Sequence, residues 1–370
     1  MAMNKITYSQ SLDLLRFPLA VIIVIVHVFN SDGITFQGVT SGFEAYPFFM
    51  GVNRFVDGFL RSQSVPIYYF ISGYVFFLGG EMTRGVYLRK FRNRVNTLLI
   101  PYFVWNLFAL LILVVTVVPP FNQFRSNASE FTPSLHGFSS AFWMYDGSLE
   151  GVNMTTAFPI SQPLWFVRNL IIVILCTPLI HFILKKTKYY MIVVLGVFWF
   201  VANSCHIKTY DFDVAFLFFS WGGYMSINQK NMVTVFQRFF KISVVLYIIL
   251  GVTYMMVADT MQDVAVIVKK TNIVVGLIFA YNLSTWLLQN NKCKVNPTLS
   301  SASFFLYLAH GHIARIILKL SYTVIRPESS FYLLTVHVFT VILTISVLLL
   351  AFYLLKRYTP HLLNALTGRK

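Results

Sequence analysis

The chain has 370 residues, of which 57% are hydrophobic and only 11% are charged. A soluble globular domain carries about 25% charged residues, so this composition excludes a soluble fold and predicts that lipid covers much of the surface. The formal net charge of +16 would suit a nucleic-acid-binding protein. However, the basic residues fall in short segments between apolar runs, which is a membrane-topology signal, and we expect no nucleic-acid partner.

Ten apolar segments are long enough, or nearly so, to cross the hydrocarbon core of a membrane as helices. In chain order they cover roughly residues 12–30, 59–79, 97–118, 164–184, 189–205, 212–227, 240–258, 272–289, 302–319 and 331–355. We therefore predict an all-α, polytopic integral membrane protein with about ten transmembrane helices. The chain is expected to form a single domain over residues 1–370, with spans from roughly 12 to 355 and no appended soluble domain.

The charges between these segments predict the orientation of the chain. If the N-terminus is cytoplasmic, 18 of the 29 basic residues fall in cytoplasmic segments and 11 of the 13 acidic residues fall outside. Positive charge is retained on the cytoplasmic side of membrane proteins. Both termini are therefore expected in the cytoplasm, and the two longest outside segments are expected at about 31–58 and 119–163.

The first apolar segment carries polar side chains at helical spacing. Arg16 and His27 are eleven residues apart, which returns to nearly the same helix face after a rise of about 16 Å. Asp13 lies three residues before Arg16, and Asn30 lies three residues after His27, so all four share one stripe. Ionisable groups inside a membrane usually face a bundle interior or a watery cavity. The stripe predicts a polar shaft, although His27 as a packing residue and Arg16 in a purely structural ion pair stay open.

Two further clusters favour function without excluding simpler roles. Basic residues gather before the third segment, at Arg89, Lys90, Arg92 and Arg94. Arginine suits phosphate oxygens, yet any cytoplasmic loop tends to be basic. In the second segment, Ser72 and Gly73 suit close helix packing more than catalysis.

Several motifs together resemble the membrane acyltransferase family 3, the bacterial glycan O-acyltransferases. The first is the Arg16-(ten residues)-His27 spacing. The others follow in the family's order between residues 11 and 310: Val65-Pro-Ile-Tyr-Tyr-Phe-Ile-Ser72-Gly73, Arg94 with Leu-Ile-Pro101-Tyr-Phe, Pro163-Leu-Trp165-Phe-Val-Arg168, and Ser303-Phe-Phe-Leu-Tyr307-Leu-Ala-His310. Each motif alone is weak, but their order across most of the chain is specific.

The resemblance implies transfer of an acyl group, most often acetyl, from cytoplasmic acyl-CoA to a sugar hydroxyl beyond the membrane. Acetyl-CoA would then be a donor substrate and not a bound cofactor, the acceptor would be a cell-surface or lipid-linked glycan, and the chain would sit among the lipids of a bacterial inner membrane. We expect no metal. The expected sites are catalytic at His27, Arg16 and Asp13, donor-binding at Arg16, Arg89, Arg92, Arg94 and Ser72, and substrate-binding at Trp165, Arg168, His310 and Asn30.

Some alternatives stay open from the residues alone. His27 can take a proton from the sugar hydroxyl or accept the acyl group covalently for a moment. A transporter or flippase of a lipid-linked or small anionic substrate would also have a polar shaft, but it would favour an internal repeat, which the sequence lacks. A structural subunit would not need Asp13, Arg16 and His27 on one face. The oligomeric state is not predicted.

Overall fold

The computed structural model describes residues 8–29, 34–36, 39–79, 82–117, 132–150, 156–202, 205–324 and 328–368. These ranges are almost entirely helical, with one short antiparallel hairpin of β1 (Ile34–Phe36) and β2 (Val39–Ser41). The α-helices are α1 (Tyr8–Phe29), α2 (Pro47–Phe55), α3 (Ser64–Phe77), α4 (Arg84–Arg94), α5 (Ile100–Val117), α6 (Leu135–Ala141), α7 (Trp165–Leu175), α8 (Thr177–Thr187), α9 (Tyr190–Ala202), α10 (Phe212–Ile227), α11 (Met232–Gln237), α12 (Phe240–Val257), α13 (Gln262–Gln289), α14 (Pro297–Val324), α15 (Ser330–Tyr358) and α16 (Pro360–Thr367). Short 3₁₀ turns are η1 (Phe43–Ala45), η5 (Ser148–Glu150) and η6 (Gln162–Leu164), and π-helical turns are η2 (Val56–Arg61) and η3 (Val95–Leu99).

Each of the ten predicted spans overlaps a helix, but not all of these helices are long enough to cross a membrane. Six helices in the described residues pass a test of length and apolar character, and a seventh span results if one bent pair counts as a single crossing. Helices α9 and α10 are apolar but shorter, and α3 has only 14 residues. The structure thus supports a multi-pass membrane protein, while the count of about ten and the orientation of the termini stay predictions.

The predicted fourth span, 164–184, is not one straight helix. Helices α7 and α8 meet at Cys176 and are bent by 64°. The cause lies in the sequence, because Pro178 has no backbone N–H to donate to residue 174 and its ring clashes with that carbonyl. The carbonyl oxygen of Ile174 instead accepts a hydrogen bond from the Thr177 hydroxyl at 2.6 Å.

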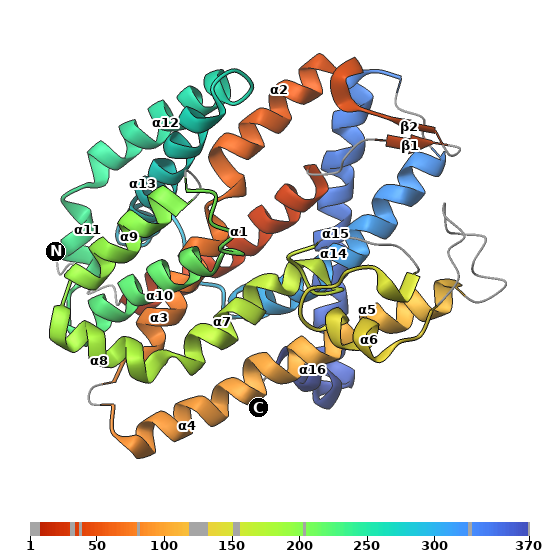
Figure 1. The fold of residues 1–370 in the computed structure, drawn as a ribbon. Helices are drawn as coiled ribbons and strands as arrows, with labels where there is room; N and C mark the ends of the chain where they lie inside the picture. Colours follow the sequence, from red (N-terminus) through yellow and green to blue (C-terminus); the bar gives the residue numbers. More distant parts are fainter. Residues whose placement is uncertain are drawn as a thin grey trace.

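The basic segment 81–96, which the sequence suggested was a loop, is largely helical. Helix α4 begins after Thr83, whose side chain caps it, and it continues through η3 into α5, so that one helical rod covers Arg84–Thr116. Figure 1 shows α4 running along one end of the bundle beside α16, with α2 and the hairpin at the opposite end. The π turn η3 interrupts this rod where it passes the bundle interior, and such turns are frequent at functional sites.

Helix α1 crosses the middle of the bundle and packs against α13, α14 and α15 (Figure 1). Two side chains of α3 tie it down: the hydroxyl of Tyr68 donates to the Arg16 carbonyl at 2.6 Å, and that of Ser64 donates to the Leu19 carbonyl at 3.2 Å. These bonds fix the height of α1 relative to α3. They therefore fix where the polar stripe of α1 meets the rest of the bundle.

Helices α3 and α10 approach each other through glycines. A Cβ atom at Gly73 would lie 2.0 Å from the backbone oxygen of Phe219, and one at Gly222 would lie 2.0 Å from the backbone oxygen of Phe70. No side chain fits at such distances, so both positions require glycine. This agrees with the packing role that the sequence favours for Gly73.

Candidate active site

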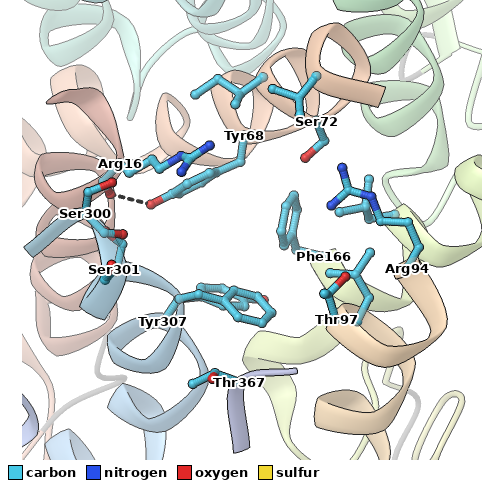
Figure 2. A pocket seen from close by; sticks show the side chains of 16 residues that line it. Arg16, Tyr68, Ser72, Arg94, Thr97, Phe166, Ser300, Ser301, Tyr307 and Thr367 are labelled. Carbon is cyan, nitrogen blue, oxygen red and sulfur yellow. Dashed lines mark hydrogen bonds between the residues drawn. The ribbon is translucent and has the colours of Figure 1, made fainter. Parts of the chain in front are cut away.

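A cavity of about 290 Å³ opens beside the first turns of α1, and we call it the arginine cavity. Its walls come from α1, α3, the end of α4, η3, α7, the first half of α14 and the end of α16, and they include Arg16, Ser72, Arg94, Phe166 and Tyr307. Figure 2 shows the guanidinium groups of Arg16 and Arg94 reaching toward the same space from opposite walls. Two donor forks facing one cavity suit an anionic group such as a phosphate.

Arg16 forms the expected ion pair on its own helix. Its guanidinium lies 3.0 Å from the Asp13 carboxylate, and both side chains are roughly one-third exposed. An ion pair that is this accessible contributes little to stability. Because the pair is weak, the Arg16 guanidinium can engage a ligand in the cavity while Asp13 holds its orientation.

The basic residues of α4 have different surroundings in the structure. Arg94 lines the arginine cavity, whereas Arg89 and Arg92 are exposed on the outer face of α4. Lys90 caps α3, since its ammonium donates to the carbonyl of Phe76 at 2.5 Å and to that of Leu78 at 2.8 Å. Of the three α4 arginines expected to bind the donor, Arg94 is therefore the one that joins Arg16 at the cavity.

A second cavity of about 270 Å³, the histidine cavity, lies near the other end of α1. His27, Arg61, Gln162 and Trp165 are among its lining residues. His27 and Trp165 thus line the same cavity, and Trp165 contributes an aromatic wall. Arg61, from η2, was not anticipated by the sequence analysis.

His310 lies behind His27 and is fully buried. The two imidazole rings are 4.9 Å apart between centroids and tilted by 56°. His310 Nδ1 lies 2.5 Å from the carbonyl oxygen of Tyr307, so Nδ1 carries the proton and donates. Its Nε2 is then a lone-pair acceptor, and it finds no hydrogen-bond partner among the described residues. His310 is therefore a buried neighbour of His27. It does not lie at a substrate-facing wall, where the sequence suggested it would lie.

The two cavities are separated by Phe166 and Tyr307, which line both of them. Their rings are 5.6 Å apart and meet edge to face. The Tyr307 hydroxyl donates to the Pro163 carbonyl, and Tyr69 donates to the Phe166 carbonyl at 3.2 Å. These two aromatic side chains form a partition between the cavities.

Arg168 donates its hydrogen bonds to other groups of the protein. It is 3% exposed, and its NH1 donates to the carbonyls of Trp143 at 2.7 Å and Ala157 at 2.9 Å. Its Nε and NH2 both donate to the Asn169 side chain. Arg168 therefore ties the segment before α7 to the bundle, and contact with a substrate stays an untested expectation.

Helix α1 carries both Arg16 and His27, but the two side chains line different cavities. The sequence analysis did not anticipate the partition or the wall that Arg61 provides. Tyr307 stands inside a quoted motif, and its position three residues before His310 was the available signal. Phe166 also stands inside a quoted motif, but neither Phe166 nor Arg61 carried a signal for its role, because these roles depend on which helices become neighbours. Asn30, expected to bind substrate, lies outside the described residues.

The comparison with known families agrees with this arrangement. A sequence model of acyltransferase family 3, described as an acyltransferase domain, matches residues 9–356. No curated protein and no solved structure matches the chain. The match covers nearly the whole chain, including every residue of both cavities except Thr367. The chain is therefore a multi-pass membrane protein that belongs to acyltransferase family 3.

Proposed function

We propose that this protein transfers an acyl group, most simply acetyl, from acyl-CoA in the cytoplasm to a sugar hydroxyl of a cell-surface or lipid-linked glycan. The observation that carries the proposal is that α1 presents Arg16 to one cavity and His27 to the next, with only Phe166 and Tyr307 between them. A donor and an acceptor can then approach the same point from opposite ends of the bundle.

The arginine cavity suits the donor. Its mouth continues along α4 into a smaller cavity of about 190 Å³ that shares Arg94 and Thr97 with it and adds Lys90 and Asn93. Coenzyme A carries phosphates, which arginine forks bind well. We expect the nucleotide to lie along α4 and the pantetheine arm to extend past Arg16 and Ser72, so that the thioester reaches the partition.

His27 is the group best suited to the chemistry. In one route, neutral His27 takes the proton of the sugar hydroxyl while the oxygen attacks the thioester carbonyl. The C–S bond then breaks, the CoA thiolate leaves, and the proton returns from His27 to the solvent or to the thiolate. In the other route, His27 attacks the thioester and releases CoA thiolate, and the sugar hydroxyl then takes the acyl group from the imidazole.

The transporter alternative receives less support. Membership of an acyltransferase family does not favour it. Phe166 and Tyr307 also stand between the two cavities, whose other lining residues differ. An acyl group needs only to reach the partition from one side, whereas a transported solute must pass through it.

The test measures acyl-CoA turnover by the purified full-length protein in detergent. We expect the wild type to release CoA from acetyl-CoA when a glycan extract is added, and we expect His27→Ala to lose this activity by at least about a hundredfold, as for removal of a general base. His361→Ala is the matched control, because His361 is exposed on α16. Equal rates for the wild type and His27→Ala would remove His27 from the chemistry. Absence of turnover with acetyl-CoA and with succinyl-CoA would overturn the proposed function.

A further inference from the structure

A third cavity of about 410 Å³ adjoins the histidine cavity, and we call it the acidic cavity. It lies among the first turns of α3, α7, α10 and α13, together with the end of η2. Asp211 and Asp213 contribute two carboxylates, and Trp165 and Trp199 contribute aromatic walls. The sequence analysis assigned no role to either aspartate or to Trp199.

The acidic cavity borders the site of His27. It shares Arg61, Val65 and Trp165 with the histidine cavity. A ligand held in the acidic cavity therefore lies next to Trp165 and can extend one of its groups toward His27. Trp165 stands at the junction, where a flat ligand face can pack against its indole.

The acidic cavity contains a carboxylate oxygen that lacks a partner. Asp213 is 8% exposed, and its Oδ1 finds no hydrogen-bond donor among the residues that the structure describes. A buried carboxylate oxygen without a donor is costly to leave unsatisfied. Asp213 lines the cavity, so a hydroxyl of a ligand there can supply the missing donor.

Asp211 adds a second carboxylate through an unusual backbone conformation. Its φ of 62° lies in the left-handed region, which few residues other than glycine adopt readily. It is the N-cap residue of α10, yet its side chain makes no capping hydrogen bond. The carboxylate therefore stands apart from the helix end that it would ordinarily cap.

The cations around this cavity are already engaged by the protein. The buried Lys270 ammonium donates to the Trp199 carbonyl, and both Arg61 and Lys269 pair with Asp57. A ligand with several hydroxyl groups can donate to the carboxylates and also accept from the N–H groups that these three cations retain.

We propose that the acidic cavity binds a neutral sugar ring of the acceptor glycan, with Asp213 and Asp211 accepting hydrogen bonds from its hydroxyl groups. This inference rests on the proposed function and specifies how its acceptor is held. The ring packs against Trp165, and a hydroxyl of the same or the adjoining sugar enters the histidine cavity. The aspartates bind the acceptor and take no part in the acyl transfer.

Ligand binding without acyl-CoA tests the inference separately from catalysis. Saturation-transfer NMR on the full-length protein in detergent would use the methyl glycosides of glucose, galactose, mannose and N-acetylglucosamine, with inorganic phosphate and glucose 1-phosphate as anionic probes. We expect saturable binding of at least one neutral glycoside by the wild type. The affinity for it should fall at least tenfold in Asp213→Asn, which keeps the shape of the side chain but removes its charge.

Two further variants sharpen the result. Asp211→Asn should also weaken binding, and it should fold normally because asparagine tolerates a positive φ. Asp263→Asn is the matched control, since Asp263 is exposed at the start of α13 and does not line the cavity; it should bind like the wild type.

Three results would overturn the inference: no neutral glycoside binds, Asp213→Asn binds as well as the wild type, or only the anionic probes bind. None of these outcomes depends on acyl-CoA turnover. Loss of turnover in the wild type, by contrast, would overturn the proposed function while leaving the sugar-binding result as measured.

Discussion

The imidazole of His310 illustrates how a buried residue can act through its neighbour. Since its Nδ1 donates to the Tyr307 carbonyl, its Nε2 can only accept a hydrogen bond while the ring is neutral. The His27 ring is 4.9 Å away between centroids. We expect an N–H of His27 to turn toward this acceptor during the reaction, which leaves the other nitrogen of His27 as the base or nucleophile.

Replacing His310 tests this positioning role. His310→Leu should lower kcat by about tenfold or more, equivalent to about 1.4 kcal/mol of transition-state stabilisation, with KM for acetyl-CoA unchanged. His310→Gln offers an acceptor oxygen near the former Nε2 and should restore part of kcat. The measurement is steady-state CoA release across a range of pH. A His310→Leu variant with normal kcat and only a lowered melting temperature would assign His310 to packing alone.

The arginines of α4 allow a prediction about the donor. Arg94 lines the arginine cavity, while Arg92 is exposed on the same helix. Hydrogen bonds to charged groups contribute about 1.5–3 kcal/mol, so Arg94→Ala should raise KM for acetyl-CoA by about tenfold or more. Arg92→Ala should change KM much less, and it serves as the control. A larger effect at Arg92 than at Arg94 would place the donor outside the cavity.

At the scale of single elements, the sequence predicted helices more reliably than their interruptions. The ten apolar runs each overlap a helix because hydrophobic length is a strong signal, whereas the short helices between them were not predicted. The bend between α7 and α8 also has a local cause in the sequence, which is Pro178. The helical character of residues 84–94 has no such local signal, because a basic polar segment between two spans resembles a loop until it packs against the bundle.

The contact between α3 and α10 gives a prediction at this scale. Gly73→Ala should lower the melting temperature, because its Cβ would meet the Phe219 backbone, which cannot move aside as a side chain can. Overpacking of this kind costs about 1–3 kcal/mol. Thermal unfolding in detergent would measure the change.

Gly85 provides the control for that experiment. It lies in α4, and a Cβ there would meet nothing within 4 Å, so Gly85→Ala should be neutral or slightly stabilising, as expected when alanine replaces glycine inside a helix. An equal loss of stability in both variants would show that the close approach of α3 and α10 is not the cause.

At the scale of the whole molecule, the site depends on tertiary structure, and only the contribution of α1 could be predicted from the sequence. The spacing of Arg16 and His27 predicted a polar face, and the structure places those two side chains in two different cavities. The partition by Phe166 and Tyr307 and the acidic cavity around Asp213 could not be predicted. They join residues from helices whose adjacency no local pattern in the sequence encodes.

Under the proposed function, the two-cavity arrangement lets a donor and an acceptor from two compartments approach one partition. Neither cavity needs to open through the bundle, because the acyl group alone must reach the partition. The hydroxyl of Tyr307 anchors its half of the partition by donating a hydrogen bond to the Pro163 carbonyl. The predicted orientation, with α4 at the cytoplasmic side, follows from the same arrangement if the donor is cytoplasmic.

The most direct measurement of this account follows labelled acetyl groups across a sealed membrane. Inside-out vesicles from cells that express the chain would receive acetyl-labelled acetyl-CoA only in the outer bath, and label on glycan inside the vesicles would be counted. The account predicts that wild-type vesicles accumulate protected label and that His27→Ala vesicles do not. Label that appears only on glycan exposed to the bath, or that accumulates equally in His27→Ala vesicles, would contradict it.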